Sequence, residues 1–73
     1  MNTLWTVRTT YGMAIKDYKT DDYEMAEEKA IREVGTNSFK SIETATKEDI
    51  FWVASMGGYL PKAARDIAGI KRE

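Results

Sequence analysis

The stretch from Thr20 to Gly35 constrains the fold most, because its start, its period and its end all indicate one amphipathic helix. The oxygen-bearing side chains of residues 20–22 can accept hydrogen bonds from the first free backbone N–H groups, and Gly35 stands where a positive φ is expected. Between these signals, apolar residues recur on a 3.6-residue period; they are Tyr23, Ala26, Ala30, Ile31 and Val34. We therefore predict a helix over residues 21–34.

A β-hairpin is predicted on the N-terminal side of this helix, over residues 3–18. Its first half is dense in β-branched and aromatic residues that alternate between two faces. Trp5 and Val7 share one of these faces, which we expect to be buried. Gly12 follows Thr10 and Tyr11 and can supply a positive φ in the connecting turn.

A third strand is predicted over residues 39–45. Phe39 and Ile42 fall out of strict alternation there, and a bulge or an edge position would explain the mismatch. A hairpin, a helix and a further strand suggest a three-stranded sheet with the helix across one face. If the crossover is right-handed, the third strand pairs antiparallel beside the first, in the order 2-1-3.

Two short helices are predicted at the C-terminal end. Thr46 and Asp49 have the spacing of a capping box, which predicts a helix over residues 47–56. Pro61 fits the first position of another helix, over residues 61–68, followed by a tail at 69–73. We therefore predict a single α+β domain, ββαβαα, in which a three-stranded, mainly antiparallel sheet packs on helices.

The residue types that are missing exclude much chemistry. The 73 residues contain neither cysteine nor histidine, so the commonest nucleophilic, general-base and metal-binding side chains are absent. The serines and threonines have no histidine base to activate them. The acidic side chains at Asp17, Asp21, Asp22 and Glu24 lack calcium-loop spacing and suit a helix start instead. We expect no enzymatic activity, no metal, no cofactor and no small-molecule ligand.

Composition and charge favour a globular cytoplasmic protein. Hydrophobic residues make up 42% of the chain and charged residues 32%, a balance typical of folded domains. No apolar run approaches the ~18–20 residues of a membrane span, and residues 1–3 lack the features of a signal peptide. The net charge of −1 gives no overall attraction to nucleic acid or to anionic lipid.

The helix over residues 47–56 is apolar on all sides, and this makes it the first candidate for function. Its core-facing stripe needs only Ile50, Val53 and Ala54. A domain this small has little interior with which to surround a central helix. The remaining apolar residues are then expected to form a protein interface, although packing on the sheet stays an alternative; they are Phe51, Trp52, Met56 and Tyr59.

Nucleic-acid binding is the alternative hypothesis. The span of residues 50–70 has about the length of a helix-turn-helix unit, and the basic excess of the chain is confined to its C-terminal end. The residues that would contact DNA are Lys62, Arg65, Lys71 and Arg72. Asp66 inside the proposed recognition helix weighs against this hypothesis. A weaker variant places single-stranded nucleic acid on the sheet, stacked on Trp5, Tyr11 and Tyr18.

These observations favour a small, non-enzymatic interaction or regulatory module that binds a partner protein or a second copy of itself. Such a compact chain without catalytic residues resembles in style the accessory proteins that phages and mobile elements encode, although no motif carries that comparison. The sequence does not decide whether Phe51, Trp52 and Met56 lie in the core or on the surface.

Overall fold

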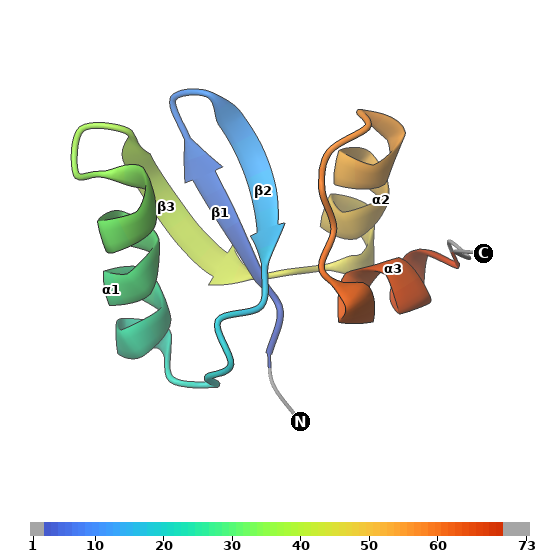
Figure 1. Cartoon of the computed structure of the whole chain (residues 1–73), viewed down its shortest axis with the longest axis horizontal. Helices are drawn as coiled ribbons and strands as arrows, with labels where there is room; N and C mark the ends of the chain where they lie inside the picture. Colours follow the sequence, from blue (N-terminus) through green and yellow to red (C-terminus); the bar gives the residue numbers. More distant parts are fainter. Residues whose placement is uncertain (1–2, 70–73) are drawn as a thin grey trace.

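The computed structural model describes residues 3–69 and places a three-stranded sheet between helices (Figure 1). The elements are β1 (Trp5–Thr9), β2 (Gly12–Lys16), α1 (Tyr23–Val34), β3 (Phe39–Thr44), α2 (Lys47–Ser55) and α3 (Lys62–Ala68). The strands lie in the order β2-β1-β3, and β1 is antiparallel to both neighbours. The predicted ββαβαα fold and the predicted 2-1-3 strand order are confirmed.

The central strand β1 is covered on both faces. On one face, Trp5 and Val7 pack with Ile42 of β3 against Ala26 and Ala30 of α1. On the other face lies a second cluster, contributed by β2, α2, α3 and the segment that joins the two helices; its buried members are Ile15, Ile50, Val53, Leu60 and Ala64. Figure 1 shows α1 on one side of the sheet and both α2 and α3 on the other.

Helix α1 begins at Tyr23 rather than at residue 21, because Asp22 is still extended and acts as the N-cap. The Asp22 carboxylate accepts a hydrogen bond of 3.0 Å from the Glu24 backbone N–H. Gly35 ends the helix with a φ of 91°. Only Ala26 and Ala30 of the predicted stripe are fully buried, because their small side chains bring the helix axis close to the sheet. Tyr23 is 48% exposed and meets Trp5 edge-on.

Strand β3 carries a bulge, one of the two explanations offered for its broken alternation. Arg8 pairs with Ser41, whereas Thr9 pairs with Phe39, so Lys40 is an extra residue on the β3 side. The bulge lets Phe39 and Ile42 pack on the same cluster despite their odd spacing. Strand β3 is also at the edge of the sheet, so both explanations for the broken alternation apply.

Helices α2 and α3 begin and end close to the predicted positions. Both hydrogen bonds of the Thr46–Asp49 capping box are present. Helix α2 ends at Ser55, one residue before the predicted end, and Met56 is its C-cap. Pro61 is the N-cap of α3 instead of its first residue. Most of the predicted tail at 69–73 lies outside the described residues.

A buried threonine joins α2 to the sheet. Thr6 is 0% exposed, and its hydroxyl donates a hydrogen bond of 3.0 Å to Oδ2 of Asp49. The other carboxylate oxygen, Oδ1, lies 3.8 Å from Nη2 of Arg8, which also pairs with Glu43. The carboxylate that caps α2 therefore also binds the central strand. The sequence placed Thr6 opposite the face expected to be buried, so this contact was missed.

Replacing Thr6 by Val should lower the free energy of unfolding by about 1.5–3 kcal/mol, the range for a hydrogen bond to a charged acceptor. The valine keeps the shape of the side chain but removes the hydroxyl that donates to Asp49, so that only the longer contact with Arg8 still joins this carboxylate to the sheet. Urea unfolding measures the change, and Thr44→Val on the exposed edge of β3 is the matched control, expected within about 0.5 kcal/mol of the wild type. Equal losses of unfolding free energy in Thr6→Val and Thr44→Val would contradict the role of Thr6 in anchoring α2 to the sheet.

Candidate protein-binding surface

Helix α2 presents an apolar face to solvent. Its core side consists of Ile50 and Val53, which are 2% and 4% exposed. The four predicted interface residues are all on the surface; their exposed fractions are 49% for Phe51, 57% for Trp52, 69% for Met56 and 75% for Tyr59. We call these four residues the α2 surface. The structure thus answers the question that the sequence left open, in favour of exposure.

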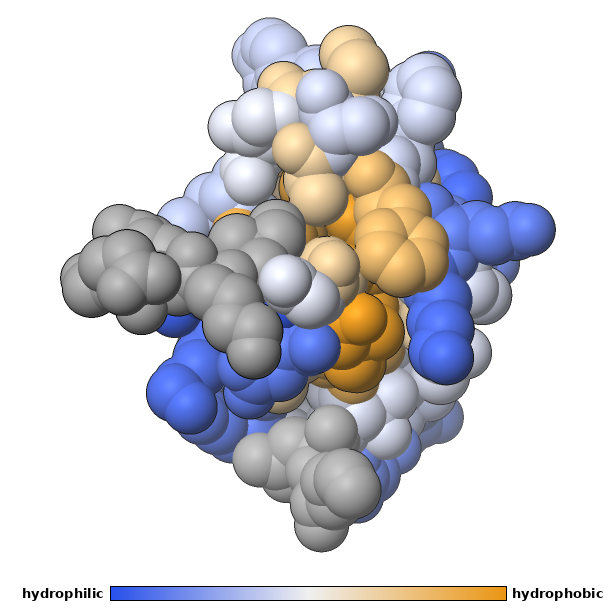
Figure 2. Space-filling model, turned by 90° about the vertical axis from the view of Figure 1, so that its right-hand side faces the viewer, coloured by the Kyte–Doolittle hydropathy of each residue, from blue (hydrophilic) through white to orange (hydrophobic). Residues whose placement is uncertain are grey.

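The helical period explains this exposure. Successive residues of an α-helix are about 100° apart, so the side that carries Ile50 and Val53 is the one that can meet β2 and α3. Phe51, Trp52 and Met56 occupy the remaining arc, and no further element of the described chain covers it. Figure 2 views this side of the molecule and shows hydrophobic residues gathered in a band between hydrophilic flanks.

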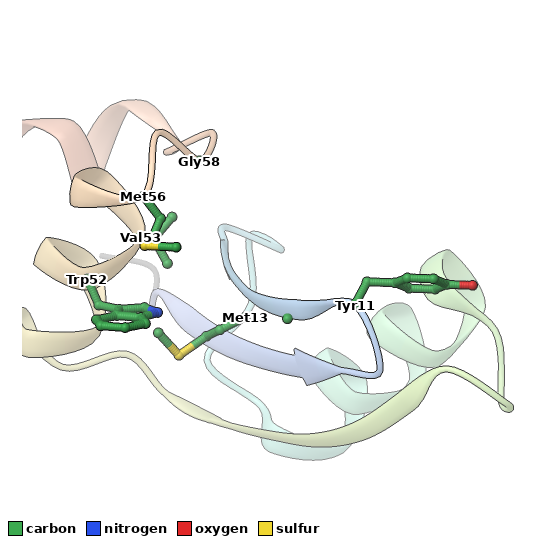
Figure 3. A pocket seen from close by; sticks show the side chains of 7 residues that line it. Tyr11, Met13, Trp52, Val53, Met56 and Gly58 are labelled. Carbon is green, nitrogen blue, oxygen red and sulfur yellow. The ribbon is translucent and has the colours of Figure 1, made fainter.

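A pocket of 280 Å³ lies beside the α2 surface, between the start of β2 and the C-terminal half of α2. Its lining consists of Tyr11, Gly12, Met13, Trp52, Val53, Met56 and Gly58, and no charged residue belongs to it. Figure 3 shows Met13 directed toward Trp52, whereas the ring of Tyr11 extends away from the pocket. A Trp and two Met side chains provide polarizable, adaptable walls suited to apolar side chains.

Sequence reasoning missed the part of this site that the hairpin of β1 and β2 supplies. Met13 falls within the predicted hairpin with no role of its own, and Tyr11 was expected only as part of a turn or as a possible base-stacking residue. Neither residue carries a local signal for the pocket, because its other wall comes from α2, about 40 positions later in the chain. The apolar excess of α2 was the one signal that pointed to the region.

Two of the four basic residues in the DNA-binding hypothesis lie within residues 3–69, and each is near an oxygen atom of its own chain. Lys62 lies 3.9 Å from Oδ2 of Asp66, within its own helix. Arg65 is half-buried, and its Nη1 donates a hydrogen bond of 3.4 Å to the backbone oxygen of Leu60. Lys71 and Arg72 lie outside the described residues.

Nucleic acid cannot stack on Trp5, because this residue is 2% exposed and its Nε1 donates to the backbone oxygen of Thr20. That part of the sheet-binding hypothesis is wrong. The physical reason is that β1 is the central strand, and α1 covers the face on which Trp5 lies. Tyr11, in contrast, is 89% exposed at the tip of the hairpin.

Two titratable groups, Tyr18 and Asp21, have shifted pKa values because of hydrogen bonds to other segments of the chain and, for Tyr18, burial. Burial, followed by a hydrogen bond of 2.8 Å to Oε1 of Glu33 and by the negative charge of that carboxylate, raises the pKa of Tyr18 well above its ordinary value. Hydrogen bonds from the hydroxyl and the backbone N–H of Thr3 lower the pKa of Asp21. Neither group lines the pocket beside α2.

Within residues 3–69, no group of three or more acidic side chains is placed to hold a metal ion. None of the described helices has the length and apolar character needed to cross a membrane. Comparison with protein-family models, with curated proteins and with solved structures finds no match to this chain. The function is therefore inferred from the geometry of its own residues.

The two tryptophans should differ sharply in their contribution to stability. Trp5→Ala should cost about 3–5 kcal/mol, as for other buried aromatic residues. Trp52→Ala should cost only about 1–2 kcal/mol, because more than half of its side chain is already in water. Urea unfolding of both variants checks the difference, and a loss at Trp52 as large as that at Trp5 would place Trp52 in the core.

Tyr18 should make the free energy of unfolding depend on pH in the alkaline range. Its folded pKa is raised above the unfolded value of about 10, so its contribution is fully present below pH ~10 and is lost as the pH rises through the folded value. The free energy of unfolding should therefore fall less steeply above pH ~10 in Tyr18→Phe than in the wild type. Tyrosinate absorbance should also show one delayed ionisation that the variant lacks. Identical pH dependences would contradict this account.

Proposed function

We propose that this chain is a non-enzymatic protein-binding module of the cytoplasm, with the α2 surface as its contact site. The observation that supports this most is the exposure of Trp52, Met56 and Tyr59, each more than half in water, beside an uncharged pocket. Aromatic residues and Met are enriched where proteins meet, and a few such residues dominate the binding energy. We assign such a module a regulatory or accessory role.

The α2 surface rests on a rigid support. Helix α2 is capped at Thr46, and Asp49 binds the central strand through Thr6. Its inner side packs on Ile15 of β2 within the second core cluster. A partner therefore does not have to order the helix on binding, and less of the interaction free energy is lost to conformational entropy.

The lining of the pocket favours binding over catalysis. Trp, Met, Val and Gly supply no general acid, general base or nucleophile at ordinary pKa values. Tyr11 is the one lining residue with a side-chain hydroxyl, and its ring extends away from the pocket in Figure 3. The volume of 280 Å³ is also slightly below the ~300–1,000 Å³ of typical small-molecule sites.

A display library of peptides and protein fragments, selected on the immobilised chain, tests the proposal. Ligands that use the α2 surface should bind Trp52→Ser at least about 30-fold more weakly, the loss expected for a hot-spot residue of 2 kcal/mol. Met25→Ser is the control, because Met25 is 47% exposed on α1, on the opposite side of the sheet. Self-association that depends on Trp52 in the same way would equally support the proposal.

Two results would contradict it. The first is a set of ligands, or a self-associated state, that binds the wild type and Trp52→Ser equally well. The second is binding of a mixed-sequence DNA duplex that weakens steeply with salt, since released counterions are the signature of phosphate contacts. The second result would assign function to the basic residues around α3 instead.

A further inference from the structure

We propose that the occupant of the α2 surface is a second copy of this chain, in a two-fold symmetric dimer that also uses Tyr11 and the pocket beside β2. This inference rests on the proposed function and names its partner. A symmetric dimer needs a surface that is complementary to itself, with a protrusion and a recess on the same face. The chain has a recess, the pocket beside α2, and a protruding residue, Tyr11, at the border of that pocket.

The recess is the pocket between β2 and α2, whose walls include Met13, Trp52 and Met56. The protrusion is Tyr11, which borders the same pocket and is the most exposed large hydrophobic residue, at 89%. Figure 3 shows its ring directed away from its own pocket, so it does not fill the recess of its own chain. The ring of one copy can therefore enter the recess of the other, and the two-fold axis repeats the contact.

The exposed area matches what a dimer needs. Tyr11 and the four residues of the α2 surface are between 49% and 89% exposed. At about 200 Å² for each large side chain, they present roughly 700 Å² to solvent. Stable interfaces bury about 800 Å² on each partner, whereas the largest apolar patch of a typical monomer is about 300–600 Å². A surface of this size on so small a chain is therefore close to that of one half of a dimer.

The charges also permit two copies to meet. No charged residue lines the pocket, and the net charge of the chain is only −1. A large net charge keeps proteins monomeric through repulsion between copies, and this chain has almost none. The contact consequently needs no compensating ion pairs from a partner of opposite charge.

Sedimentation velocity of the full chain, from low micromolar to millimolar concentration, tests the dimer. The wild type should show a reversible monomer–dimer equilibrium. Met56→Lys should weaken dimerisation at least about tenfold, because a lysine charge would have to be desolvated in the contact. Met25→Lys is the matched control on the other side of the sheet and should dimerise like the wild type.

Tyr11→Ser is a second variant at a position so exposed that the fold does not depend on it, and it should weaken dimerisation in the same direction. Thermal unfolding of each variant confirms that it is folded. A wild type that stays monomeric throughout, or a dimer that Met56→Lys and Tyr11→Ser leave unchanged, would overturn the inference. A monomer that still selects Trp52-dependent ligands would overturn the dimer alone and leave the proposed function in place.

Discussion

Three consecutive residues of β1, Trp5, Thr6 and Val7, are buried. Because successive side chains of a strand point to opposite faces, both faces of the sheet must then be covered. Helix α1 covers one face through Ala26 and Ala30, and the pair α2 and α3 covers the other. The chain has no further element within residues 3–69 to lay over the outside of α2. The apolar face of that helix is left in water as a direct consequence.

The hydroxyl of Thr6 fixes the position of α2 on the sheet. A buried hydroxyl needs a hydrogen-bond partner, and the partner here is the Asp49 carboxylate that also caps α2. One acidic side chain thus sets where α2 begins and how it is seated on the central strand. The position of Asp49 also sets the position of one wall of the pocket. Trp52 and Val53 follow Asp49 within α2, and Met56 is the C-cap of this helix.

Local signals predicted most of the fold. The caps of α1 and α2, the order of elements and the bulge in β3 each depend on residues close together in the sequence, and the structure confirms them. The burial of Thr6 was missed because it depends on Asp49, which lies 43 residues away. The sequence likewise singled out the four residues of the α2 surface and favoured their exposure without deciding it, because an all-apolar helix fits equally well in a core or at an interface. The basic residues of the alternative hypothesis stay a prediction: Lys62 lies near Asp66 at the i,i+4 spacing that the sequence already shows, whereas the hydrogen bond from Arg65 to the backbone oxygen of Leu60 depends on how the chain turns before α3.

The central claim is that the outer face of α2 is open in the free chain and covered when it functions. Fluorine NMR of protein labelled with 5-fluorotryptophan tests this directly, because the chain has two tryptophans, one buried and one exposed. In dilute solution, the Trp52 signal should shift when H2O is replaced by D2O, and the Trp5 signal should not. As the concentration rises, or as a selected ligand is added, the Trp52 signal should lose this solvent response while that of Trp5 stays unchanged. Two results would contradict the account. One is a Trp52 signal that does not respond to D2O even in the dilute monomer. The other is a Trp52 signal that keeps its full response to D2O at every protein concentration and with every selected ligand.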